Sequence, residues 1–166
     1  MNIEIKDVAK DDWREFRRIR LTALQESPFA FGGTYLEESK LEVADWKERV
    51  SRYVDDPDTV FLLCSVKSEI VGMAGCYRDK EKTDCSHIYS VWLKPDVRGQ
   101  GIAERMVAIV ERWSRENGFS VIEGHVTEVN SVARAFYKKQ GYKETVTDSA
   151  LKWDPGVKQI LIRKTI

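Results

Sequence analysis

The most informative stretch of this chain is Val97-Arg98-Gly99-Gln100-Gly101-Ile102-Ala103-Glu104 (VRGQGIAE). It follows an apolar segment that stops at Pro95, and it precedes apolar residues at helical spacing: Ile102, Met106, Ile109, Val110 and Trp113. The stretch therefore predicts a turn from a strand into a helix N-terminus, where backbone N–H groups are unpaired and the helix dipole is positive. Two glycines and Arg98 beside these groups favour a phosphate site over a plain turn.

Two common phosphate-binding motifs do not match this stretch. A P-loop requires Lys and then Ser or Thr directly after its last glycine, but Ile102 follows Gly101. A dinucleotide-binding fingerprint requires a third glycine where Glu104 stands. The ligand predicted for this loop is therefore a different pyrophosphate compound.

A third motif matches well. Arg98-x-x-Gly101-x-Ala103 resembles the (Gln/Arg)-x-x-Gly-x-(Gly/Ala) signature of the GNAT N-acetyltransferase superfamily. A second stretch, Asn130 to Tyr142 (NSVARAFYKKQGY), resembles the other signature of that superfamily: an Asn after the fifth strand, then Ala-x-x-x-Tyr and a Gly-aromatic stop. The resemblance runs from about Ile3 to Lys164 and is specific from Tyr89 to Tyr142.

The periodicity along the chain predicts the element order β-α-α-β-β-β-α-β-α-β-β. This order describes an α/β protein with a mixed sheet and helices on its faces, in a single domain of residues 1–166, and it agrees with the GNAT fold. Strands are expected near 3–8, 59–66, 70–78, 85–94, 120–126, 142–146 and 158–164, and helices near 13–24, 43–53, 102–117 and 131–140.

Composition narrows the partners and the location. The 27 Lys and Arg residues balance the 27 Asp and Glu residues, which argues against nucleic-acid binding. Three cysteines (Cys64, Cys76, Cys85) without CxxC spacing argue against a disulfide framework or a metal site. The longest apolar run, Val60 to Val66, is too short to cross a bilayer, and the first ten residues lack a signal-peptide core. We therefore expect a cytoplasmic protein that binds no membrane.

The resemblance implies a site for acetyl-CoA as co-substrate, without a metal. The strand before the loop pairs its backbone with the pantetheine arm through Val91, Trp92 and Leu93, and an N–H of Leu93 or Val91 polarises the acetyl carbonyl. Arg98 and the main chain hold the pyrophosphate, the latter through Gly99, Gln100, Gly101, Ile102, Ala103 and Glu104. Asn130 hydrogen-bonds the pantetheine or, alternatively, only caps the following helix.

The resemblance also implies that Tyr137 is the general acid that protonates the departing thiolate, whereas the alternative is an aromatic residue packed in the core. The sequence does not identify the general base. The candidates are water and five side chains: Glu37, Glu38, His87, Glu123 and His125.

The predicted reaction is direct transfer of acetyl to a primary amine, either of a small molecule or of a protein N-terminus or lysine. Phe29, Phe31, Tyr35 and Trp153, together with Glu37 and Glu38, either suit a cationic amine or only pin a loop to the core. One alternative function is a non-catalytic acyl-CoA-binding regulatory module. Another is a cysteine enzyme that uses Cys85 with His87. Many members of the superfamily dimerise, so a homodimer is also open.

Overall fold

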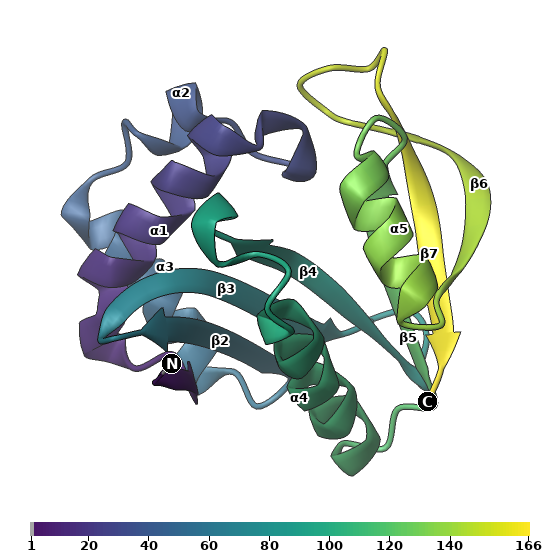
Figure 1. The fold of residues 1–166 in the computed structure, drawn as a ribbon, viewed down its shortest axis with the longest axis horizontal. Helices are drawn as coiled ribbons and strands as arrows, with labels where there is room; N and C mark the ends of the chain where they lie inside the picture. The colour runs from purple at the N-terminus through teal and green to yellow at the C-terminus, as the bar shows by residue number, and fades with distance from the viewer. Residues whose placement is uncertain (1) are drawn as a thin grey trace.

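A seven-stranded mixed sheet forms the centre of the computed structural model, which describes residues 2–166 (Figure 1). The strand order across the sheet is β1-β2-β3-β4-β5-β7-β6, and only the β4–β5 pair is parallel. The strands are β1 (Ile3–Asp7), β2 (Thr59–Val66), β3 (Glu69–Arg78), β4 (Cys85–Leu93), β5 (Val121–Thr127), β6 (Lys143–Ala150) and β7 (Lys158–Thr165). The predicted α/β class and mixed sheet are confirmed.

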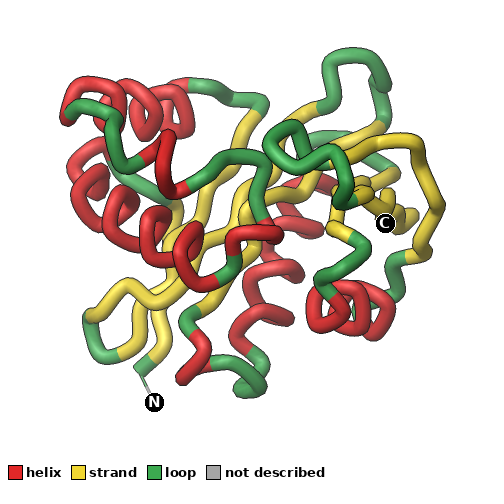
Figure 2. Tube along the Cα trace, turned by 90° about the horizontal axis from the view of Figure 1, so that it is seen from above, coloured by secondary structure: helices red, strands yellow, loops and turns green. Residues whose placement is uncertain are grey.

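Helices cover both faces of this sheet, and Figure 2 shows them on either side of the strands. They are α1 (Trp13–Glu26), α2 (Tyr35–Glu38), α3 (Val43–Asp55), α4 (Ile102–Glu116) and α5 (Ser131–Lys139). Three 3-10 turns span Lys10–Asp12, Pro28–Ala30 and Pro95–Val97. None of the helices in the described part of the chain is long and apolar enough to cross a membrane.

The long helices bury apolar side chains against the sheet. On one face of the sheet, Phe16 and Ile19 of α1 and Trp46 of α3 pack against β2 and β3. On the other face, Ile102 and Met106 of α4 pack against the strands together with residues of α5. The three cysteines lie in strands and are free and buried.

The element order differs from the expectation at α2, an additional helix between the two that were predicted before β2. Thr34 caps it, because its hydroxyl accepts a hydrogen bond from the Glu37 N–H. Four residues are too few to display a helical period of apolar residues, so the pattern could not reveal this helix.

The sheet opens between β4 and β5, and this opening positions the site. Their pairing covers only Cys85 to His87 opposite Val121 to Glu123, after which the two strands diverge (Figure 1). On the other side of β4, the register with β3 is interrupted between Met73 and Gly75. Ser90 lies at this irregularity with φ of 54°, a left-handed conformation that is uncommon outside glycine. One edge of β4 is therefore unpaired from Ile88 onwards.

Candidate active site

The VRGQGIAE loop leads from the unpaired part of β4 into α4. Gly99 and Gly101 have φ of 74° and 75°, and a Cβ built on either would meet no atom within 4 Å. Gly101 is the N-cap of α4, and no side chain caps this helix. The amides from Gly99 to Glu104 donate no hydrogen bond to any described residue. Six free N–H groups beside open space at a helix N-terminus fit an anion as large as a pyrophosphate.

Arg98 is fixed beside this loop. Its Nε donates to the Leu93 carbonyl at 2.9 Å, and its guanidinium forms an ion pair with Glu26 at 2.8 Å. Partial burial opposes ionisation of Glu26, but hydrogen bonds from Arg98, Ser27 and Trp92 outweigh it and lower the pKa of this carboxyl. No sequence pattern indicated Glu26 as a partner, because it lies 72 positions from Arg98. Arg98 thus adds less net charge to the loop than expected.

Val91, Trp92 and Leu93 line the unpaired edge through their backbone. The Lys94 N–H donates to Val71 of β3, and successive residues of a strand point their N–H groups in opposite directions. The Leu93 N–H therefore points away from β3, toward the opening. The side chains of Trp92 and Leu93 are buried in the cores on opposite faces of the sheet. Of the two predicted amides, Leu93 has the clearer geometry, because Val91 falls within the irregular stretch.

Tyr137 lies on α5 and is 7% exposed. Its ring contacts Tyr142, with the ring centroids 5.2 Å apart. Its hydroxyl makes no hydrogen bond to a described residue, and burial raises its pKa. The hydroxyl is therefore free to donate a proton to a bound ligand, and its loss would remove no hydrogen bond from the fold. Asn130 caps α5 by accepting from the Ala133 N–H at 3.1 Å, which leaves its side-chain NH₂ free.

A cavity of about 320 Å³ lies on the α1 face of the sheet, at the opening between β4 and β5. Ser90 and Gly124 line it where the strands diverge, and His87 and His125 line it along the sheet. Arg20 of α1, Glu38 of α2 and Arg49 of α3 line its other side. The cavity therefore meets the unpaired edge of β4, which makes it the candidate acceptor site.

The predicted carboxylates do not face this cavity as free acids. Both oxygens of Glu38 accept hydrogen bonds from Arg20, at 2.6 and 2.9 Å, and Arg49 adds a third bond at 2.9 Å. Burial opposes ionisation of Glu38, but the two guanidinium groups outweigh it and lower its pKa. Glu37 is exposed and hydrogen-bonds Thr34 at the start of α2. Glu38 is therefore engaged by two arginines, and Glu37 does not line the cavity, which argues against both as the general base or as a site for a cationic amine.

The predicted aromatic residues mostly fix the loop after α1. Phe29 stacks on Trp153 with ring centroids 5.4 Å apart, and the Trp153 indole donates to the Phe31 carbonyl. Phe31 is buried under the Arg20 guanidinium, 4.7 Å from its ring centroid. Phe31 lines the cavity, whereas Phe29, Tyr35 and Trp153 do not.

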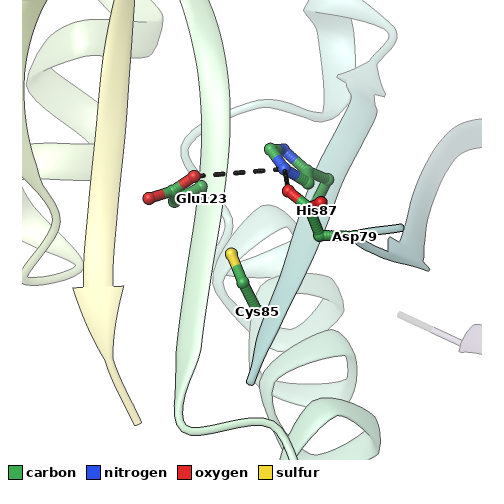
Figure 3. Close-up of side chains that lie close together, drawn as sticks. All are labelled: Asp79, Cys85, His87 and Glu123. Atoms are coloured by element: carbon green, nitrogen blue, oxygen red, sulfur yellow. Dashed lines mark hydrogen bonds and ion pairs between the residues drawn. The ribbon is translucent and has the colours of Figure 1, made fainter. Parts of the chain in front are cut away.

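A polar cluster extends from the histidines (Figure 3). The His87 Nε2 lies 2.6 Å from Asp79 and 4.0 Å from Glu123. The Glu81 backbone N–H and the His87 imidazole lower the pKa of Asp79 to about 2, so this carboxylate stays charged. The imidazole rings of His87 and His125 are parallel within 3°, at 6.3 Å. Asp79, which the sequence did not indicate, fixes the orientation of His87.

Glu123 and His125, two of the remaining candidates for the general base, lie in different environments. Lys82 and Arg163 bind the two oxygens of Glu123 at 2.6 and 2.5 Å, and these bonds outweigh burial and lower its pKa. Glu123 is therefore a poor proton acceptor, because both of its oxygens are bound to cationic side chains. His125 keeps part of its surface exposed, and partial desolvation of its ring and the neighbouring His87 lower its pKa. The histidines are therefore the candidates that the cavity retains.

The same cluster brings four metal-binding side chain types together: Asp79, Cys85, His87 and Glu123. Their ligand atoms lie within 4.8 Å of one another. However, the ammonium of Lys82 and the guanidinium of Arg163 already bind Glu123, and burial and Glu123 raise the pKa of the Cys85 thiol to about 12. A thiol that resists ionisation is a poor metal ligand and a poor nucleophile, which argues against the cysteine mechanism with His87.

The sheet opens beside a helix N-terminus that is lined by free amides. This arrangement is the one expected for the class of protein that the two sequence motifs resemble. The chain belongs to the Acetyltransferase (GNAT) family, whose model matches residues 7–142. An uncharacterized N-acetyltransferase of Methanocaldococcus jannaschii is 26% identical over 144 residues, which are 84% of this chain and 60% of that protein. The chain therefore spans less than two thirds of this relative's length.

Solved structures agree on the fold. The PaiA N-acetyltransferase of Thermoplasma acidophilum, in complex with coenzyme A, superposes with a TM-score of 0.78 at 19% identity and covers both chains fully. A ribosomal-protein-alanine N-acetyltransferase of Brucella melitensis has a TM-score of 0.80 at 18% identity, over 98% of this chain and 99% of that chain. The names of these two relatives differ, and a similar fold therefore does not identify the acceptor of this chain.

Proposed function

We propose that this chain transfers the acetyl group of acetyl-CoA to a primary amine. The observation that carries the proposal is the run of six free amides from Gly99 to Glu104, directly beside the unpaired edge of β4. Family membership and the coenzyme A complex of the Thermoplasma relative support the same donor. The three free, buried cysteines suit a reducing compartment such as the cytoplasm.

Donor binding is assigned to backbone groups more than to side chains. The amides of Gly99, Gln100, Gly101, Ile102, Ala103 and Glu104 bind the pyrophosphate, with Arg98 at the edge of the loop. The backbone of Val91, Trp92 and Leu93 pairs with the pantetheine, and the free NH₂ of Asn130 donates to it. Only the shape of the main chain is needed for most of these contacts.

Acetyl-CoA supplies a thioester whose acetyl carbon an unprotonated amine can attack. The Leu93 N–H donates to the carbonyl oxygen and stabilises the charge that develops there. His87, held by Asp79 at 2.6 Å, accepts the proton that the amine loses as its nitrogen forms the new bond to carbon. Tyr137 donates its proton to the sulfur as the carbon–sulfur bond breaks. The products are an N-acetyl amine and the thiol of coenzyme A.

The first test is the thermal stability of the protein with acetyl-CoA, with NAD and ATP as controls. Acetyl-CoA at about 100 times its dissociation constant should add ~2.7 kcal/mol of apparent stability, because it binds only the folded chain. A rise in Tm with acetyl-CoA alone, followed by amine-dependent release of the thiol, supports the proposal. Binding without thiol release from any amine would instead favour the non-catalytic module.

Replacing Gly101 with alanine tests the loop. We expect the dissociation constant for acetyl-CoA to rise at least about tenfold, because a Cβ would enter the space beside the free amides, and a tenfold change corresponds to ~1.4 kcal/mol. Calorimetric titration measures this change.

Gly118→Ala is the matched control for that prediction. Gly118 ends α4 with φ of 81°, and a Cβ there also meets no atom within 4 Å. Both substitutions place alanine in the left-handed region at a similar cost of roughly 1–2 kcal/mol. Equal losses of affinity in the two variants would mean that the loop effect is only a loss of stability.

A further inference from the structure

The acceptor cavity carries an unbalanced positive charge, and this charge identifies the class of amine. We infer that the acceptor is a small amine of amino-acid type, whose free carboxylate binds beside Arg49 while its amine faces His87. This inference rests on the proposed function and deepens it. It differs from the cationic amine that the sequence left open, because the carboxylate that could bind such an amine, Glu38, is already engaged.

The charges around the cavity do not cancel. Its lining contains two guanidinium groups, Arg20 and Arg49, but only one carboxylate, Glu38. The polar cluster behind His87 does cancel, because Asp79 and Glu123 are matched by Lys82 and Arg163. One positive charge is therefore left on the α1–α3 side of the cavity.

That charge is assigned to Arg49. Arg20 is 5% exposed and binds Glu38 through two nitrogens, with its third nitrogen 3.3 Å from the Ser90 hydroxyl. Arg49 uses one terminal nitrogen for Glu38 and its Nε for the Tyr53 hydroxyl. Its other terminal nitrogen has no hydrogen-bond partner among the described residues, and its side chain keeps 25% of its exposure.

A carboxylate is the natural partner for this group. A guanidinium presents its N–H groups in a plane that matches a carboxylate, and a charge-assisted bond is stronger in a partly desolvated pocket than in water. The Phe16 and Trp46 rings lie 5.6 and 5.8 Å from the Arg49 guanidinium carbon and shield it from solvent. Glu38 neutralises one of the two guanidinium charges, and a bound carboxylate would neutralise the other.

Two walls of the cavity then suit the two polar groups of an amino acid, its carboxylate and its amine. The guanidinium groups come from helices α1 and α3, whereas the histidines come from strands β4 and β5 at the opening of the sheet. A volume of about 320 Å³ is at the small end of the range for ligand pockets, roughly 300–1,000 Å³. A protein N-terminus lacks the adjacent carboxylate, because that group is an amide in a chain.

Binding to the protein saturated with coenzyme A tests the inference without depending on turnover. The probes are two matched series: phenylalanine, phenylalaninamide and phenethylamine, and lysine, lysinamide and 1,5-diaminopentane. Calorimetry should give at least one amino acid that binds at least about tenfold tighter than both its amide and its decarboxylated amine, as expected for a hydrogen bond between charged groups. The amide arm separates a free amino acid from a peptide N-terminus.

Variants assign the preference to a residue. In Arg49→Gln the preference should vanish, whereas in Arg49→Lys it should persist in part, because the charge remains without the planar fork. Arg52→Gln is the control, since it removes an exposed arginine of the same helix that does not line the cavity.

Equal binding within each series, no binding by either amino acid, or a preference that survives in Arg49→Gln would overturn the inference. These outcomes leave the proposed function intact if acetyl-CoA still raises Tm and some other amine releases the thiol. Conversely, a carboxylate preference in a protein that releases no thiol with any amine would count against the proposed function.

Discussion

Tyr137→Phe should lower the turnover number at least about 10²-fold while the affinity for acetyl-CoA stays the same. The Tyr137 side chain is largely buried, but its hydroxyl makes no hydrogen bond to a described residue, so removing the hydroxyl takes no protein hydrogen bond from the folded chain. Burial also raises its pKa, so the phenol is protonated at neutral pH and able to protonate a departing thiolate. Thiol release under saturating substrates measures the turnover, and calorimetry measures the affinity.

Tyr142→Phe is the matched control. Tyr142 is also buried, contacts the Tyr137 ring and donates to Glu111 at 3.2 Å. Loss of this hydrogen bond should lower stability by about 1 kcal/mol and leave the turnover number unchanged. If Tyr137→Phe turns over at the wild-type rate, or if both variants lose rate equally, Tyr137 is not the acid.

His87→Gln should lower the turnover number by about 10² or more, with acetyl-CoA binding retained. The imidazole Nε2 is held at 2.6 Å by Asp79, which leaves the other ring nitrogen free to accept a proton. Glutamine fills a similar volume and hydrogen-bonds Asp79, but it does not accept a proton near neutral pH. Steady-state rates with a saturating amine at constant pH measure the loss.

Two further variants separate a base from a structural residue. Asp79→Asn should cause a smaller loss than His87→Gln, because Asp79 is a positioning residue that acts through the ring. His125→Gln should also cost less, although its ring lies 6.3 Å from that of His87. A larger loss in His125→Gln than in His87→Gln would assign proton transfer to β5 instead of β4.

Much of the fold could be predicted from local patterns in the sequence. The apolar stripe Ile102, Met106 and Val110 predicted α4, and these residues are buried as expected. The two family motifs predicted a GNAT fold, which the family match confirms. The miss at α2 has a local reason as well, because the four residues Tyr35–Glu38 are held by a cap and not by an apolar stripe.

The interactions of the polar side chains in the site were much harder to predict from the sequence. Glu38 was a candidate base and Arg20 was not considered, yet the structure joins them in a buried ion pair. Asp79 is close to His87 in space although it lies on the other side of a turn, eight positions earlier. A charged residue has many partners of opposite sign in a chain with 27 of each, so composition could not select the right pairs.

Local sequence patterns predict the long helices, the strands and the glycine loop, because these depend on neighbours within a few positions of one another. Which charges remain free depends on the folded chain. Arg98 is paired with Glu26 across 72 positions, Glu123 with Arg163 across 40, and Arg20 with Glu38 across 18, whereas Arg49 keeps a free nitrogen. These pairings arise because the sheet brings distant segments together, and a buried charge is stable only when a partner lies beside it.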